Sequence, residues 1–496
     1  MAVLTPEVRG PTGPMPVVGG TRRRRLRHLP FGVLVALAAG LRAVAVLGYQ
    51  GVLWFPDSHS YLAVAVSPRP YPARPQGYAF FLRLLEPLHS FLAVAVVQHL
   101  MGLAAGVLIY ALLRGRFRAP GWVAAGCAVP VLFDGYQLEL EHMLLSDTLF
   151  WFCVLVAVVL VLWRPDSWRV AAAAGLALGL AAVTRSVGLP LLAVVLAYPL
   201  LRRRWRVAGA LGAACLLPVL AYAVWFHGTW GRYALTNSDG IFLYSRTAAF
   251  ADCGIIHPPA SERPLCPSGP PATRTNSPNY IWHVGPLGQM GNYRKFSPPV
   301  NAWAGDFARR AITTQPGAYV STGLGDLART FSGTREPYPT RYAVRLYDFP
   351  TRIGPLPLHV RPVPGMRLGT AVHTYTASNS DGRARIVEPY AAFMRGYQRM
   401  IYLPGPALAV ILAGGAIALV VRRRTAGTAL LPWACAAALL VVPPFTAAFD
   451  HRYVIPAVPL ACLALGIAVG TARRAAEKPA VPVQAPRPAR EPGAAR

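Results

Sequence analysis

Long apolar segments alternate along the chain with short polar or basic ones. About 20 predominantly apolar residues are enough to cross a lipid bilayer as a helix. Seven candidate spans precede residue 227 and three follow residue 400. They cover residues 30–49, 90–113, 119–136, 146–163, 170–184, 187–201, 207–226, 401–421, 427–446 and 453–471. The pattern predicts an all-α polytopic membrane protein with about ten transmembrane helices.

Two longer stretches interrupt this alternation. Residues 50–89 contain Pro70 and Pro72 and predict a kinked, interfacial loop, since proline breaks a helix interior. Residues 227–400 are polar and rich in Pro, Gly, Asn, Ser and Tyr, which predicts a mixed or irregular extracytoplasmic region between helices seven and eight. Within it, helical spacing of apolar residues predicts one amphipathic helix over 301–331, kinked at Pro316.

The predicted spans divide the chain into five parts. Residues 30–226 form a transmembrane module that carries external loops, 227–400 form the extracytoplasmic region, and 401–471 form the last three helices. Residues 1–29 are Pro/Gly-rich and then basic, and 472–496 are rich in Pro, Ala and Arg. Both ends therefore predict disordered cytoplasmic tails.

Positive charge sets the predicted topology. The chain has 49 Lys+Arg against 20 Asp+Glu, a net charge of +29, but only 14% of its residues are charged. Arginines gather in short clusters between apolar segments, at Arg22–Arg25 with Arg27, Arg114/Arg116/Arg118, Arg202–Arg204 with Arg206, and Arg422–Arg424. This positive-inside pattern predicts a multi-pass plasma-membrane protein with both termini cytoplasmic. It accounts for the charge without a nucleic-acid partner.

Five of the seven cysteines lie in apolar segments, where they are expected to pack as small core residues. Cys253 and Cys266 lie close together in the predicted external region, where an oxidising compartment favours a disulfide. No CxxC metal pattern occurs in the sequence.

Ionisable residues at membrane level collect on the predicted outer side, where they indicate function. Carboxylates there can accept a proton from a hydroxyl or hold a divalent cation, and arginines can hold a phosphate through paired donors. The residues are Asp57, His59, Glu139, Glu141, His142, Asp147, Arg185, Asp450, His451 and Arg452.

Each of these residues also has a purely structural interpretation. Asp147, next to Ser146 and before an apolar run, could stabilise a helix N-terminus. Glu139 and Glu141 could lie on a solvated loop face. His142 and His451 could be hydrogen-bonded interface residues, and Arg185 and Arg452 could extend toward the lipid headgroups.

The order of five motifs resembles a known family. They are Pro56-Asp57-Ser58-His59-Ser60-Tyr61, Arg74-Pro75-Gln76-Gly77-Tyr78-Ala79-Phe80-Phe81-Leu82, Glu141-His142-Met143-Leu144-Leu145-Ser146-Asp147-Thr148-Leu149-Phe150-Trp151, Thr184-Arg185-Ser186-Val187-Gly188-Leu189-Pro190, and His451-Arg452-Tyr453-Val454-Ile455-Pro456-Ala457-Val458-Pro459. Over roughly 30–226 and 401–471 the chain resembles GT-C-type glycosyltransferases, the group that includes protein O-mannosyltransferases and lipid A aminoarabinose transferases. The arginine-rich style of 227–400 suggests a high-GC actinobacterial source.

The resemblance implies a cell-envelope enzyme that takes a sugar from a polyprenyl-phosphate donor. Asp57 matches the family's first-loop aspartate, a general base or acceptor-positioning residue in an inverting transfer. Asp147 matches the second acidic position, with Glu141 as a nearby candidate. On electrostatic grounds Arg185 and Arg452 are expected to contact the donor phosphate. His59, Tyr61 and Tyr78 complete the expected substrate-binding residues.

One departure from the family pattern concerns the metal. Many relatives have a second acidic residue near the first-loop aspartate, whereas Ser58 and His59 follow Asp57 here. A divalent cation, Mg²⁺ or Mn²⁺, held by Asp57 with His59 as a compensating ligand, is therefore an open question. The sugar and the acceptor, whether glycan, lipid or protein, are also open.

Three other functions compete with this one. A transporter or flippase would place ionisable residues at the bilayer midplane and show broken helices in paired halves. A non-catalytic envelope scaffold would keep the fold without needing Asp57. An O-antigen-ligase-like transferase with a diphosphate-linked donor would rely on external arginines and histidine in place of the aspartate.

Overall fold

The computed structural model of the chain describes residues 28–421 and 427–476. The predictions for residues 1–27, for Arg422–Arg424 and for residues 477–496 lie outside this range. The first five residues of the predicted C-terminal tail, 472–476, continue the last helix.

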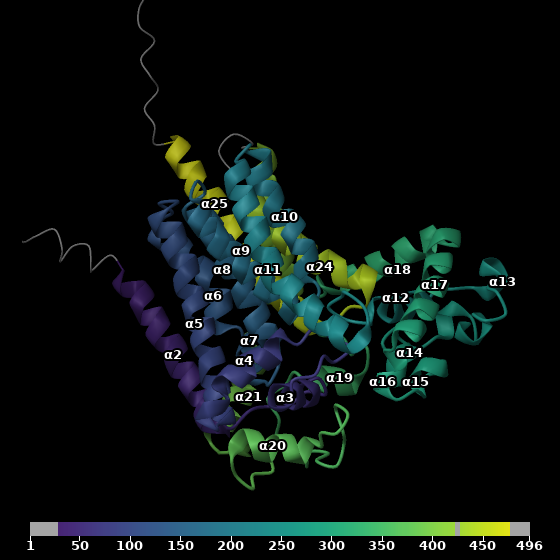
Figure 1. Cartoon of the computed structure of the whole chain (residues 1–496). Helices are drawn as coiled ribbons and strands as arrows, with labels where there is room; N and C mark the ends of the chain where they lie inside the picture. Colours follow the sequence, from purple (N-terminus) through teal and green to yellow (C-terminus); the bar gives the residue numbers. More distant parts are fainter. Residues whose placement is uncertain (1–27, 422–426, 477–496) are drawn as a thin grey trace, which may run out of the picture.

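Each of the ten predicted segments contains a helix. Their bounds are α2 Leu29–Gly48, α5 Phe91–Gly115, α6 Gly121–Phe133, α8 Asp147–Trp163, α9 Trp168–Thr184, α10 Gly188–Leu201, α11 Trp205–Trp230, α22 Gly405–Val421, α24 Leu430–Thr446 and α25 Val458–Ala476. These helices form one bundle, from which α2 leans away at one side (Figure 1).

Not all of these helices reach the length of a membrane span. Four segments of the described chain are long and apolar enough: α2, α5, α11 and residues 451–470, which include most of α25. A fifth arises if α21, Tyr390–Met400, is joined to α22 across a bend of 55°. The remaining bundle helices, α6, α8, α9, α10 and α24, are apolar but shorter. The chain is thus built for a membrane, and the number of ten crossings stays a prediction.

Small residues allow the closest helix contact in the bundle, between α9 and α11. A Cβ atom at Gly175 would collide with the carbonyl oxygen of Leu211, and one at Gly179 with that of Cys215. Close backbone approach through small residues is a common way for helices to associate in lipid, where apolar side chains alone provide no driving force.

Short elements cover the end of the bundle opposite the described chain ends, here called the loop end (Figure 1). Those from the first half of the chain are β1 Tyr49–Gln50, α3 Ser58–Val66, α4 Gly77–Leu85, η1 Glu86–Leu88 and α7 Gly135–His142. The last turns of the chain before α25 are η4 His451–Tyr453 and η5 Ile455–Ala457.

The region 227–400 is helical and irregular, because its only strand among the described residues is β2, two residues long and antiparallel to β1. The expectation of a mixed or irregular region thus takes the form of short helices joined by irregular segments. The predicted helix over 301–331 is two helices, since Gln315 leaves helical geometry before Pro316. The elements are α12 Asp239–Ala248, α13 Cys253–Ile256, η2 Arg263–Leu265, η3 Pro271–Thr273, α14 Asn279–Trp282, α15 Gly285–Gly288, α16 Asn292–Lys295, α17 Pro298–Thr314, α18 Pro316–Arg329, α19 Arg341–Arg345, α20 Leu368–Thr376, β2 Arg385–Ile386 and α21.

Two large apolar clusters hold the molecule together. One lies among the bundle helices. The other joins the first loop, including Tyr61 and Tyr78, and Leu140 of α7 to the region after α11, including Phe307 and Tyr375. The disulfide between Cys253 and Cys266 closes a short loop at the far side of that region. The region after α11 therefore packs directly onto the loops that carry the candidate site residues.

Arg42 lies inside the protein and joins α2, α5 and α7. Its guanidinium donates from Nε and Nη2 to the two carboxylate oxygens of Glu141, each at 2.9 Å, and from Nη1 to the carbonyl of Leu132. Glu141 also contacts His99 Nδ1 on α5 and accepts from Gln137. Gly102 leaves the space for this carboxylate, because a Cβ there would overlap Glu141 Oε1.

We expect Gly102→Ala to destabilise the protein by about 1–3 kcal/mol, since the added methyl forces a buried ion pair apart. The measurement is the thermal unfolding midpoint in detergent. Gly126→Ala on α6 is the matched control, because no atom lies within 4 Å of its Cβ position. Equal midpoints for the two variants would contradict the packing of Gly102 against Glu141.

Candidate functional site

Five ionised side chains from distant parts of the chain meet at the loop end and form what we call the charge cluster: Asp57, Arg74, Asp147, Arg185 and Arg452. Arg74 Nη1 lies 2.8 Å from Asp57 Oδ1, and Arg452 donates from Nη1 and Nη2 to Asp57 Oδ2, both at 3.3 Å. Arg185 Nη1 lies 2.6 Å from Asp147 Oδ1. Arg452 Nη1 lies 3.9 Å from Asp147 Oδ2 and so links the two carboxylates.

The backbone before α3 presents Asp57 to this cluster. Leu53 is held against residues 142–144, donating to the His142 carbonyl and accepting from the Leu144 amide. Ser58 Oγ donates to the Leu144 carbonyl and accepts from the Phe55 amide. Asp57 is the N-cap residue of α3, yet its side chain makes no capping bond. Its carboxylate is therefore available to the arginines.

Arg74 reaches Asp57 through a tight turn that packs on the end of α9. A Cβ atom at Gly77 would collide with the Val183 carbonyl oxygen and with Thr184 Oγ1. This close approach brings the start of α4 next to Arg185. The guanidinium of Arg74 also lies over the rings of Tyr61 and Tyr71, at 5.9 and 5.7 Å from their centroids.

Asp147 and Arg185 come from the facing ends of neighbouring helices. Asp147 occupies the first turn of α8 and is completely buried, and Arg185 is the C-cap residue of α9. Their contact is an ion pair without hydrogen-bond geometry. Ser146, the N-cap residue, makes no side-chain cap. Asp147 thus does more than stabilise the helix terminus.

Arg452 occupies the centre of the cluster. It belongs to η4 and is 8% exposed, with its guanidinium over the rings of Phe55 and Tyr453 at 4.6 and 5.4 Å. Asp450 accepts the Arg452 amide at Oδ1 and lies 3.3 Å from its Nε at Oδ2. Tyr347, from the region after α11, donates to Asp450 Oδ2 at 2.9 Å.

The charges at the cluster balance once its neighbour Asp450 is counted. Three guanidiniums face the two carboxylates of the cluster and that of Asp450, and the side chains of Asp57, Arg74 and Arg185 are each only 17% exposed. Burial alone would raise the pKa of Asp57, but the charges of Arg74, Arg452 and Arg185 outweigh it and lower this pKa below its usual value. Asp57 is therefore held ionised, and the three guanidiniums gathered here offer hydrogen-bond donors to an anion.

The other expected substrate-binding residues lie around this cluster at different depths. Tyr61 is buried beside Arg74 and donates to Ser146 Oγ at 3.0 Å. His59 is half-buried against the Trp54 ring, and burial lowers its pKa. Tyr78 is completely buried and donates to Gln98, one layer below. Tyr78 thus supports the loop and does not face the charge cluster.

The acidic residues of α7 are also buried, contrary to the interpretation as a solvated loop face. Glu141 is enclosed by Arg42, His99 and Gln137 and does not join the charge cluster. His142 Nε2 donates to the Tyr49 carbonyl, and its Nδ1 contacts His99 Nε2. Glu139 is completely buried, and burial raises its pKa well above the usual range.

Arg74, Asp450 and Tyr347 were not among the site residues expected from the sequence. Arg74 is the first residue of the motif that runs to Leu82, directly before Pro75. Its positive charge in that external loop was the signal that could have identified it. Asp450 lies two residues before Arg452 and was visible as an outer-side carboxylate. Tyr347 lies in a region without recognisable motifs, so only the fold could place it.

Asp57 and His59 do not gather the ligands that a divalent cation needs. Within residues 28–421 and 427–476 no group of three or more His, Cys, Asp or Glu side chains could hold a metal. Both oxygens of Asp57 already face guanidiniums. The expected Asp57–His59 pair therefore does not fit Mg²⁺ or Mn²⁺, which prefer several oxygen ligands.

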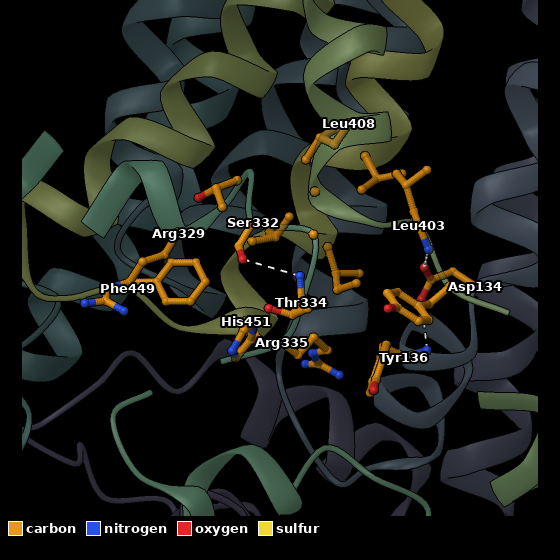
Figure 2. A pocket seen from close by; sticks show the side chains of 17 residues that line it. Asp134, Tyr136, Arg329, Ser332, Thr334, Arg335, Leu403, Leu408, Phe449 and His451 are labelled. Carbon is orange, nitrogen blue, oxygen red and sulfur yellow. Dashed lines mark hydrogen bonds between the residues drawn. The ribbon is translucent and has the colours of Figure 1, made fainter. Parts of the chain in front are cut away.

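A small pocket of about 60 Å³ has His451, the sequence neighbour of Arg452, in its lining. The polar side chains of the lining include Arg335, Tyr136, Arg329 and Asp134 (Figure 2). An apolar groove of about 230 Å³ lies between α18, α22 and α24. Leu408 of α22 lines the pocket, and Leu412, one turn later, lines the groove.

Neither a protein-family model nor a curated protein matches this chain. Two solved structures are similar to 90% of it, both at 15% sequence identity. They are ArnT from Cupriavidus metallidurans in the apo state, with 77% of that chain covered and a TM-score of 0.32, and the same protein bound to undecaprenyl phosphate, with 79% covered and a TM-score of 0.33. TM-scores this low do not establish a common fold, so the function of this chain has to come from its own residues.

The charge cluster predicts how stability depends on pH. Because the folded pKa of Asp57 lies below its unfolded value, its ion pairs stabilise the fold fully above the unfolded pKa of about 3.9 and are lost as the pH falls through the folded pKa. We expect wild type to unfold at a higher temperature than Asp57→Asn from pH 7 to about pH 5. The gap should shrink below about pH 4. A gap that stays constant down to about pH 3, or no gap at neutral pH, would show that Asp57 is not held by the arginines.

Proposed function

We propose that this protein is an inverting glycosyltransferase of a cell membrane, moving a sugar from a polyprenyl-phosphate donor to an acceptor hydroxyl at the extracytoplasmic side. The observation that supports it best is the charge cluster, where a buried carboxylate held ionised by two arginines lies at the loop end of an apolar helical bundle. Such a transfer needs a carboxylate and a phosphate-binding group at the same depth relative to the membrane.

The donor phosphate suits Arg452 and Arg185. A guanidinium binds phosphate oxygens through paired donors, and both side chains lie next to Asp57 or Asp147 in a largely buried site. The guanidinium of Arg452 lies over the rings of Phe55 and Tyr453, which keep it within the cluster. A phosphate at the cluster would take guanidinium donors that now face carboxylates.

The transfer would proceed in one displacement. The acceptor hydroxyl oxygen attacks the anomeric carbon from the face opposite the phosphate, and the bond from that carbon to the phosphate oxygen breaks. The electron pair leaves with the polyprenyl phosphate, whose negative charge Arg452 and Arg185 stabilise. Asp57 accepts the proton of the hydroxyl. The product carries the inverted anomeric configuration.

Asp57 would become a stronger base when the donor binds. In the structure Arg452 gives both terminal nitrogens to Asp57 Oδ2, and these contacts lower its pKa. A donor phosphate competes for the same nitrogens. As the guanidinium turns to the phosphate, Asp57 loses part of its positive surroundings and its pKa rises toward the range of a useful general base.

The apolar groove between α18, α22 and α24 is suited to the first isoprene units of the donor. It is lined by carbon-rich side chains, including Phe331, Leu412 and Trp433, and lies one turn of α22 from the pocket that His451 lines. A lipid in this groove would direct its phosphate toward Arg452. The region after α11, which supplies α18 and Tyr347, would then cover the acceptor side.

No divalent cation enters this scheme. The guanidiniums of Arg452, Arg185 and Arg74 supply the positive charge that a metal would otherwise bring to the phosphate. His59 then contributes to binding through its ring, which packs at a tilt beside Trp54.

We expect Asp57→Asn to lower sugar transfer at least about 100-fold, because the amide cannot accept the hydroxyl proton. The measurement is transfer of radiolabel from a panel of polyprenyl-phosphate sugars in membranes with matched protein levels. Asp381→Asn, whose ion pair with Arg383 is exposed, is the control and should retain wild-type rates.

EDTA forms a third arm of that assay. We expect wild-type transfer to be unchanged by the chelator, and a loss restored by Mg²⁺ or Mn²⁺ would contradict the metal-free scheme. Equal transfer by wild type and Asp57→Asn would exclude Asp57 as the base. Absence of transfer from every donor would favour a scaffold or a transporter.

The groove gives a separate prediction. Ala416→Phe should raise the KM for a long-chain donor about tenfold, equivalent to ~1.4 kcal/mol, because the ring fills the groove. A donor with a chain too short to enter should be unaffected. Val410→Phe, at an exposed position of the same helix that does not line the groove, is the control. Equal KM changes for both variants, or for both chain lengths, would remove the groove from the donor site.

A further inference from the structure

We propose that Asp326, on α18 in the region after α11, is a positioning residue that fixes Arg452 in the charge cluster. The catalytic consequence rests on the proposed function, whereas the structural role of Asp326 does not. No atom of Asp326 needs to touch substrate for this role, because its contacts act on the chain segment that leads from α24 to Arg452.

This segment begins at the C-terminal end of α24, where the helical hydrogen bonding stops. The helix contains Pro443 and Pro444 and ends at Thr446. The carbonyl groups of the last turn of a helix lack partners within the helix. Here the region after α11 supplies donors for two of these carbonyls. Arg246 Nη1 donates to the Pro444 carbonyl at 3.2 Å, and Tyr319 OH donates to the Phe445 carbonyl at 3.0 Å.

Asp326 accepts a hydrogen bond from the backbone amide of Phe449, further along the same segment. In a continuing helix the amide of Phe449 would bond to the Phe445 carbonyl, but in this structure it donates to Asp326 Oδ2 at 3.2 Å. The same oxygen accepts from Tyr338 OH at 3.2 Å and from Arg246 Nη1. Oδ1 accepts from Arg329 Nε at 3.3 Å. Asp326 therefore joins α12, through Arg246, and the segment of Tyr338 to residue 449.

Burial makes these contacts strong. Asp326 is 5% exposed and Arg246 is 2% exposed, and hydrogen bonds to charged groups contribute more in a site shielded from water. The helix that carries Asp326 is also pressed against the end of α24, since a Cβ at Gly323 would collide with the Phe445 ring. The position of residue 449 is thus set from outside the bundle.

Only two residues separate Phe449 from Arg452. Asp450 follows immediately, caps η4 with its side chain on the Arg452 amide, and pairs with the Arg452 guanidinium. Tyr347 fixes the same carboxylate from the other side. The contacts run from Arg246 and Asp326 through the 449–450 backbone to Arg452 and end at Asp57.

Asp326→Asn tests this role by hydrogen exchange and by kinetics. The amide keeps the size of the side chain but removes the charge that holds Arg246 and the Phe449 amide. We expect exchange at residues 447–453 of the purified full-length protein to rise about tenfold, and kcat to fall about tenfold with a smaller change in the donor KM. Asp306→Asn, at an exposed ion pair on neighbouring α17, is the control and should change neither.

A double-mutant cycle separates positioning from general destabilisation. If Asp326 acts through Arg452, Asp326→Asn should cost much less in an Arg452→Lys background than in wild type. An equal cost in both backgrounds would overturn the proposal. Arg246→Lys, which keeps a positive charge on Asp326 but shortens the reach to Pro444, replaces Asp326→Asn if that variant does not fold.

The two proposals fail in different ways. Unchanged exchange at residues 447–453 in Asp326→Asn would overturn the positioning role whatever the activity of wild type. Increased exchange with no transfer by wild type would support the positioning of Arg452 and overturn only the transferase.

Discussion

The contact between Arg452 and Asp57 is the interaction on which the rest of this molecule depends. It joins the last turn before the final helix to the loop after the first, 395 positions apart in sequence. Two charges in a largely buried site repay their desolvation only with good geometry and further partners. Those partners come from every part of the loop end: Arg74 from the first loop, Asp147 and Arg185 from helix termini, and Asp450 with Tyr347 around the arginine.

The acidic residues singled out from the sequence have two different physical roles. Asp57 and Asp147 face arginines at the loop end, where three guanidiniums lie together and can donate to a substrate anion. Glu141, expected as a catalytic candidate, is closed off by Arg42, His99 and Gln137 inside the bundle. That ion pair orders α2, α5 and α7 and has no open side. Acidic side chains thus stabilise the packing of the helices in one place and face the candidate site in the other.

Much of this arrangement follows from the sequence. The lengths of the apolar runs, with arginine clusters between them, predicted all ten helical segments. A helix that crosses lipid needs a long apolar sequence, which composition alone reveals. The motifs also pointed to Asp57, Asp147, Arg185 and Arg452 as one set, although not to their pairing. The sequence could not show that Glu139 and Glu141 are buried, and for Glu141 the burial depends on Arg42 and on Gly102 making room. Nor could it place Asp326, whose partners Arg246, Tyr338 and Phe449 are distant in sequence and follow no periodic pattern.

The most direct test of the central claim is an experimental structure of the full-length protein with a bound polyprenyl phosphate. The account predicts that the phosphate lies within hydrogen-bonding distance of Arg452 and Arg185, with the lipid chain along α22 and α24. Arg452 should have turned from Asp57 Oδ2 toward the phosphate, leaving the carboxylate open to the acceptor side. A phosphate bound elsewhere, with the Arg452–Asp57 contact unchanged, would contradict the assignment of this cluster as the reaction centre.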